Sequence, residues 1–183
     1  RHAESAGNAD ENLYSVVPDN KVPLTETGVR QAACVTFQDK IDFVYCSPWL
    51  RAIQTKDSLN LKCVKDNIKI HPLIHEKIYT NNYSEMISIV EEKHRHIKEA
   101  KTFGEFWYKE YGKESFADVY LRAKLFYNDV LSLQNKPNIE TVLIVSHGLF
   151  LIVLQGIIEE KSPEEILQIK GFKNAEVRSF FVY

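Results

Sequence analysis

Two short apolar runs, 41–46 (IDFVYC) and 141–146 (TVLIVS), interrupt an otherwise mixed pattern of polar and apolar residues. Runs of this length are typical of strands buried on both faces. Each run leads into a segment with helical features. Ser47-Pro48 is typical of an N-cap and first helical position, for a helix that runs to about Asn60. His147-Gly148 leads into an apolar helix.

Helical spacing and capping residues predict further elements between and around these runs. Thr25 is a candidate N-cap for a helix over 26–38. Ser115 and Asp118 form a capping box before a helix whose apolar face extends to Val130, and 135–138 (NKPN) breaks it. The remaining expectations are an extended segment at 68–74, a charged helical region at 84–111, a short helix that starts at Ser162-Pro163, and a closing strand at 176–183.

Strands that alternate with helices predict an α/β fold, a three-layer α/β/α domain with a mostly parallel central sheet. We expect one domain over 1–183. In such folds ligands bind beyond the carboxyl ends of strands, near helix N-termini. This rule selects His147 and Arg51, and it selects the opening Arg-His pair if a first central strand lies upstream of residue 1.

Composition narrows the possible partners. The net charge of -2 gives no basis for binding nucleic acid, and the longest apolar run, 149–154, is too short to span a membrane. The three cysteines form no CxxC pair, which favours a reducing, cytoplasmic compartment over a disulfide framework. No targeting segment is visible in the chain.

Five motifs in order resemble the histidine phosphatase superfamily, the phosphoglycerate-mutase-like fold. They are RHAESAGN (1–8), PLTETGVRQA (23–32), SPWLRAIQT (47–55), IHEKIYTNN (74–82) and VSHG (145–148). Two more, ESFADVYLRA (114–123) and NAEVR (174–178), resemble its small phosphatase branch. Ala3 departs from the glycine that is common in the family, and Lys93–His96 lacks the Arg-Arg pair of the larger mutases.

The resemblance implies a site that neutralises a phosphate monoester, which carries close to two negative charges near neutral pH. Arginine is suited to this task because its planar group donates several hydrogen bonds and stays charged when buried. By resemblance, Arg1 and Arg51 are phosphate clamps, and Asn8, His147 and Gly148 are further phosphate-binding residues.

The resemblance also implies the chemistry. His2 corresponds to the nucleophile that forms a phosphohistidine, and its other ring nitrogen needs an acceptor, such as a backbone carbonyl. His147 stabilises the transferring phosphoryl group. Glu76 protonates the leaving oxygen and then takes a proton from water. Glu85 and Glu114 are alternative acids. Glu4, Ser5, Thr25 and Gly28 are expected to shape the loop rather than react.

The expected activity is therefore phosphatase hydrolysis of a small phosphorylated substrate, with a phosphopeptide as another option and no cofactor or metal. Mutase-type phosphoryl transfer and a non-catalytic phospholigand-binding module are the alternatives. Cys46 and Arg51 have one residue too few between them for a cysteine phosphatase. Pro72 disrupts the zinc spacing of His71 and His75, and His94-x-His96 has no completing ligand.

Residues 77–113 are expected to form a cap over the site. Its aromatic residues line either a leaving-group pocket or the core; they are Tyr79, Tyr83, Phe103, Phe106, Trp107 and Tyr108. The sequence leaves the oligomeric state open.

Overall fold

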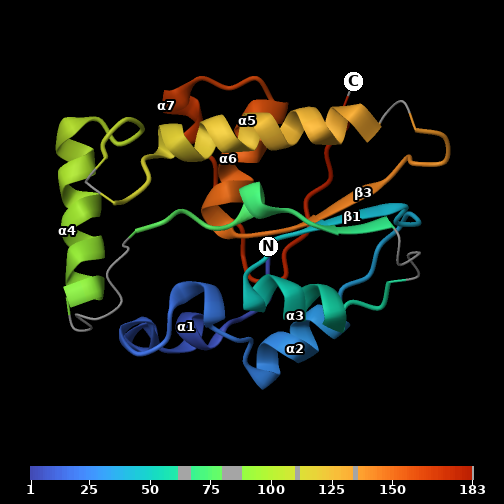
Figure 1. Ribbon diagram of the computed structural model, residues 1–183, viewed down its shortest axis with the longest axis horizontal. Coiled ribbons are helices and arrows are strands. Elements are labelled where there is room, and N and C mark those ends of the chain that lie inside the picture. Colours follow the sequence, from blue (N-terminus) through green and yellow to red (C-terminus); the bar gives the residue numbers. More distant parts are fainter. Residues whose placement is uncertain (62–66, 80–87, 110–111, 134–135, 183) are drawn as a thin grey trace.

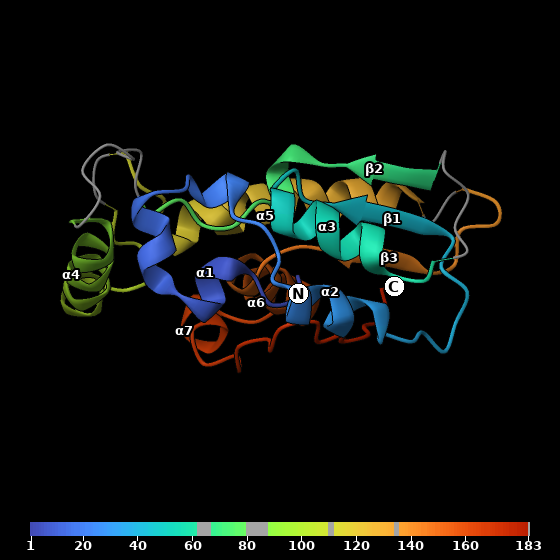
Figure 2. The ribbon, with the colours of Figure 1, turned by 90° about the horizontal axis from the view of Figure 1, so that it is seen from below.

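Three parallel strands form the centre of the structure, a computed structural model that describes residues 1–61, 67–79, 88–109, 112–133 and 136–182. β1 (Phe43–Cys46) lies between β2 (Ile68–Ile70) and β3 (Val142–Val145) (Figure 2). Val44 pairs with Ile68 on one side and with Leu143 on the other. The two strands expected from apolar runs are confirmed.

Helices cover both faces of this sheet, which confirms the three-layer α/β/α fold (Figures 1 and 2). On one side lie α2 (Glu26–Ala33) and α3 (Leu50–Ser58), and on the other α5 (Phe116–Ser132) and α6 (Gly148–Ile158). Alternation along β1 fills both interfaces: Val44 packs in the cluster with Ala52 of α3, whereas Tyr45 packs against Phe126 of α5.

Short elements surround the layers. They are α1 (Ala6–Ala9), η1 (Glu11–Ser15), η2 (Asp19–Lys21), η4 (Pro72–Ile74), α4 (Ser88–Phe103) and α7 (Pro163–Ile166). α4 stands at one end of the molecule in both ribbon views, where it packs against η1 (Figures 1 and 2). Its position agrees with the helical propensity expected for 84–111.

The expected caps are present at three helices. Thr25 Oγ1 accepts a hydrogen bond from Gly28 N at the start of α2. Ser115 and Asp118 cap each other's backbone at the start of α5, and Ser162 does the same with Glu165 at α7. These bonds satisfy N–H groups that have no partner within the helix.

Four sequence-based boundaries are wrong. α2 ends at Ala33 rather than at 38, because Val35, Thr36 and Phe37 are weak helix formers. α3 begins at Leu50 with Trp49 as N-cap, although Ser47 Oγ accepts from Trp49 N in addition to its bond with His147. β2 ends at Ile70, after which Pro72 starts a 3-10 turn. The described part of 176–183 forms no strand; it follows a turn in which Ala175 has φ 57°.

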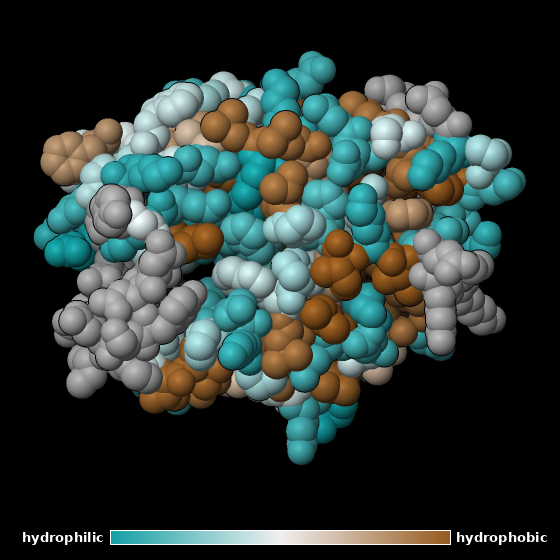
Figure 3. All heavy atoms as spheres, viewed as in Figure 1, coloured by the Kyte–Doolittle hydropathy of each residue, from teal (hydrophilic) through white to brown (hydrophobic). Residues whose placement is uncertain are grey.

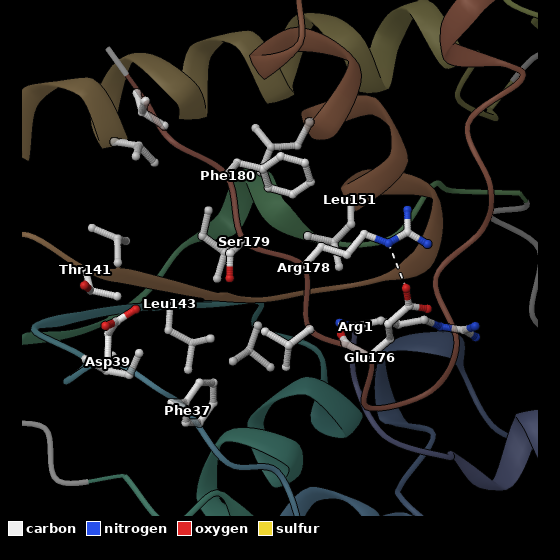
Figure 4. A pocket seen from close by; sticks show the side chains of 18 of the residues that line it. Arg1, Phe37, Asp39, Thr141, Leu143, Leu151, Glu176, Arg178, Ser179 and Phe180 are labelled. Atoms are coloured by element: carbon white, nitrogen blue, oxygen red, sulfur yellow. Dashed lines mark hydrogen bonds and ion pairs between the residues drawn. The ribbon is translucent and has the colours of Figure 1, made fainter.

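An apolar cavity of about 660 Å³ runs along the edge of β3 that faces away from β1 (Figure 4). Leu143 lines it from β3, with Phe37 and Phe180 from segments on either side. No described strand pairs with this edge.

Apolar residues on the surface are interspersed with polar ones on the face shown in Figure 3. Exposed large apolar side chains occur on several elements, including Phe103, Leu121 and Phe181. Among the residues that the structure describes, no helix is long and apolar enough to cross a membrane.

The packing of Gly28 against the N-terminal loop generates a stability prediction. A Cβ at this position would lie 2.0 Å from Glu4 O, a backbone atom. Gly28→Ala must therefore displace the loop, and we expect it to lower the free energy of unfolding by at least about 2 kcal/mol. Urea unfolding measures this change.

Gly171→Ala is the matched control, because a Cβ there meets no atom within 4 Å. It should be nearly neutral. Equal stabilities for Gly28→Ala and the wild-type protein would show that the contact with Glu4 is not required.

Candidate active site

Four separate segments meet beyond the carboxyl ends of β1 and β3. His2 N donates to Ser146 O at 2.8 Å, immediately after β3. The rings of His2 and His147 lie 5.1 Å apart, and Arg51 Nε donates to His2 Nε2 at 3.2 Å. Glu76 approaches the N-terminus of α6, where its Oε2 accepts from Leu149 N at 3.3 Å. The structure thus brings together His2, Arg51, Glu76 and His147, four of the residues that the sequence assigned to one site.

His2 is held with one ring nitrogen oriented for attack. Its Nδ1 lies 2.7 Å from Ala3 O, which can only accept, so Nδ1 carries the proton and Nε2 keeps its lone pair. The side chain is buried, and burial, followed by the charge of Arg51, lowers the pKa of His2 well below its ordinary value. A neutral imidazole whose Nε2 carries no proton is the form that can act as a nucleophile, and here that lone pair accepts from Arg51 Nε.

His147 presents an unpaired nitrogen inside the site. Its Nε2 lies 2.7 Å from Ser47 Oγ, which itself accepts from Trp49 N. The Ser47 hydroxyl proton is therefore available to His147 Nε2, and the ring proton is then on Nδ1. Burial and the nearby Arg51 lower the pKa of His147 well below its ordinary value.

Two buried nitrogens at the site, His147 Nδ1 and Arg1 Nε, have no hydrogen-bond partner among the described residues. Buried donors are nearly always paired, so this pair needs an explanation. Both belong to residues assigned to phosphate binding. A phosphoryl group, with several acceptor oxygens, would satisfy both donors at once.

Arg1 is anchored by its Nη1 and by its backbone nitrogen. Its Nη1 donates to Phe172 O at 2.8 Å, and its backbone N donates to Glu176 O at 2.9 Å. Burial lowers the pKa of the Arg1 guanidinium, while the Glu76 carboxylate acts in the opposite direction. Gly148 faces this side chain, since a Cβ there would lie 3.5 Å from Arg1 Nε.

Glu76 is positioned through its backbone by a buried ion pair. Arg122 Nη1 donates to Leu73 O and His75 O at 2.6 and 2.8 Å, and its Nη2 donates to Glu76 O at 3.3 Å. Glu114 completes this support, because it pairs with Arg122 and accepts from Ile78 N at 2.9 Å. Glu114 therefore has a structural position, and Glu85 lies outside the described residues.

Asn8 differs from the expected pattern. Its Oδ1 accepts from both the amide and the hydroxyl of Ser5, which forms the capping box of α1. The residue is exposed. Its side-chain NH₂ makes no hydrogen bond to the described residues, so a role in phosphate binding stays a proposal.

The residues of the rival chemistries have other positions. Cys46 is buried, which raises the pKa of its thiol to about 12, far from a reactive thiolate. His71 pairs with Asp129 and His75 bonds Glu76 O. Within the described ranges, no group of three or more histidine, cysteine or acidic residues could hold a metal ion.

Sequence reasoning missed four residues that support the site: Ser47, Trp49, Asp19 and Arg122. Arg122 carried a detectable signal, because it falls between Val119 and Phe126 on the buried face of α5. A charged residue at such a position predicts a buried partner. Asp19 carried no signal, being one acidic residue in an irregular loop.

Comparison with known proteins agrees with this geometry. The sequence matches the histidine phosphatase superfamily (branch 1) over residues 1–181. It is 31% identical to the phosphoglycerate mutase-like protein AT74H of Arabidopsis thaliana, covering 97% of this chain and 70% of that protein. A second Arabidopsis thaliana relative, AT74, is 28% identical, and the chain spans 62% of its length. The chain belongs to the histidine phosphatase superfamily.

Solved structures share the fold. The alpha-ribazole phosphatase of Shigella flexneri superposes with a TM-score of 0.73 at 20% identity, covering 96% of this chain and 84% of that one. The mycobacterial glucosyl-3-phosphoglycerate phosphatase superposes with a TM-score of 0.72 at 18% identity, covering 95% of this chain and 84% of that one.

The two buried histidines generate a pH prediction. Their native pKa values are depressed, whereas unfolded histidine titrates near pH 6.5. Below that value the unfolded chain binds more protons than the native protein, so stability falls with acidification and is fully present above it. When the pH is lowered from about 7.5 to about 5.5, each of the two histidines should lower the free energy of unfolding by about 1 kcal/mol.

Urea unfolding of the wild type and of a His2→Gln/His147→Gln variant at both pH values measures this loss. The variant should lose less stability than the wild type. His94→Gln, which removes an exposed imidazole from α4, is the control and should keep the wild-type pH dependence. An equal loss of unfolding free energy between the two pH values in the wild type and the double variant would contradict the prediction.

Proposed function

We propose that the protein is a metal-independent phosphatase that hydrolyses phosphate monoesters through a phosphohistidine on His2. One observation carries the proposal: His2 Nε2, the Arg51 guanidinium and two unpaired buried nitrogens, Arg1 Nε and His147 Nδ1, converge beyond the carboxyl ends of the strands. Family membership supports it, as do the phosphatase titles of structures with this fold.

In the first step, the lone pair on His2 Nε2 attacks phosphorus and the bond to the leaving oxygen breaks. Glu76, protonated in the substrate complex, gives its proton to that oxygen. The Ala3 carbonyl accepts from Nδ1–H as the ring becomes positively charged. Arg1, Arg51 and His147 stabilise the negative charge on the phosphoryl oxygens, and fixed donors in a buried site do so without reorganisation.

In the second step, water attacks the phosphohistidine and gives a proton to Glu76. The N–P bond breaks, and its electron pair returns to Nε2. Inorganic phosphate leaves and His2 is neutral again. Mutase-type transfer would replace this water with a substrate hydroxyl, so the two reactions are distinguished by whether inorganic phosphate is released.

The substrate is proposed to be a small phosphorylated molecule, with the cap over 77–113 selecting its leaving group. Phe106 is buried in the main core, whereas Phe103 and Trp107 are exposed. Tyr83 lies outside the described residues. The buried free thiol of Cys46 is compatible with the cytoplasmic location that we propose.

His2→Asn tests the nucleophile. We expect its turnover of p-nitrophenyl phosphate to fall by at least about 1,000-fold, since the covalent route is lost. The wild type, assayed in EDTA, should retain its activity and yield an acid-labile phosphoenzyme on rapid quenching. The variant should yield none while keeping the wild-type circular dichroism spectrum. A folded His2→Asn variant with a tenth of wild-type turnover would exclude His2 as the nucleophile.

Glu76→Gln tests the acid. Its loss of rate should be large for an alkyl phosphate, whose leaving oxygen needs a proton, and small for p-nitrophenyl phosphate, whose leaving oxygen does not. The measurement compares both substrates under conditions in which phosphorylation limits the rate. Equal losses on the two substrates would remove Glu76 from this role. Glu165→Gln, on the exposed α7, is the control and should leave both rates unchanged.

A further inference from the structure

Asp19 connects the N-terminal loop to the site, although no family motif quoted above contains it. It is the first residue of η2. Arg51 Nη1 donates to its backbone carbonyl at 2.5 Å and to its Oδ1 at 2.7 Å. The Arg51 side chain is 3% exposed and that of Asp19 is 24% exposed, so solvent screens this ion pair only in part.

Asp19 contacts Arg51 at Nη1, which leaves the edge formed by Nε and Nη2 for a ligand. Nε and Nη2 share one edge of the planar group, and Nε already points at His2 Nε2. Of the guanidinium nitrogens, Nη1 is the one that donates to Asp19. Nη2 makes no hydrogen bond to any residue that the structure describes. The Nε–Nη2 edge can therefore donate two parallel bonds to a phosphoryl group on His2.

Other contacts act on Arg51 from different directions. Its Cζ lies 4.7 Å from the centre of the Trp49 ring, which restrains the plane of the guanidinium. Arg51 and Arg1 repel each other, and this repulsion contributes to the lowered pKa of Arg1. The carboxylate of Asp19 offsets part of that repulsion on the side away from His2. Without the Asp19 carboxylate, the contacts that remain on the guanidinium among the described residues are the Asp19 carbonyl, the Trp49 ring and the bond to His2.

We propose that Asp19 is a positioning residue for phosphoryl transfer. It holds Arg51 so that the Nε–Nη2 edge faces the phosphorus on His2. Asp19 itself contacts neither substrate nor the reacting atoms. This inference rests on the proposed phosphatase function.

A double-mutant cycle tests it with Asp19→Ala, Arg51→Ala and the double variant, measured as kcat/KM on p-nitrophenyl phosphate. In Asp19→Ala, kcat/KM should fall about 10- to 100-fold, mainly through kcat, because misplacing a phosphate-binding group by about 1 Å has effects of this size. In the Arg51→Ala background the same substitution should change the rate less than about twofold. Vanadate should inhibit Asp19→Ala more weakly than wild type, and it should inhibit the double variant as strongly as Arg51→Ala.

Asp19→Asn keeps an oxygen acceptor and should retain more activity than Asp19→Ala. It also provides a folded test if the alanine variant is unstable. Asp57→Asn is the matched control. Asp57 lies near the C-terminal end of α3, the helix that carries Arg51, and the variant should have wild-type activity. An additive loss in the cycle would show that Asp19 only stabilises its loop, which overturns the inference alone. A wild type that forms no phosphohistidine would instead overturn the proposed function.

Discussion

The arrangement of the site depends on one electrostatic constraint: two guanidinium groups and two imidazoles share a buried corner. Arg1 and Arg51 lower the pKa of His2 in addition to burial, and Arg51 does the same to His147. Both rings are therefore neutral, and each needs a defined tautomer. Ala3 O and Ser47 Oγ set those tautomers, so the N-terminal loop and the turn after β1 have to meet at fixed distances.

The fold satisfies this constraint through backbone contacts more than through side chains. Gly28 lets α2 approach the Glu4 carbonyl, and Thr55 Oγ1 accepts from Ala3 N while donating to Arg51 O. The hydroxyl of Thr55 thus connects the N-terminal loop that carries His2 to α3, which carries Arg51. A small displacement of either would change the distance from Arg51 to His2, which links the stability of these contacts to the chemistry.

The sequence predicted those features of the fold and the site that depend on local patterns or motifs, and it did not predict those that depend on contacts between distant residues. The apolar runs at β1 and β3 identified the sheet, and motif order placed His2, Arg51, His147 and Glu76 at its carboxyl end. Periodicity could not locate the end of α2, where weak helix formers follow a continuing apolar pattern. Nor could it locate Asp19, whose role depends on a loop crossing over α3, because a single sequence records no such long-range contact.

The distribution of burial separates chemistry from substrate choice. His2, Arg51 and His147 are each 2% exposed or less, so they offer little surface to the part of a substrate beyond the phosphoryl unit. Trp49 and His75, stacked with their ring centres 5.8 Å apart, are half-buried beside His147, and Trp49 also contacts that ring. Discrimination between phosphate esters is therefore expected from half-buried residues such as these, because the buried side chains face the transferred group that every phosphate ester has in common.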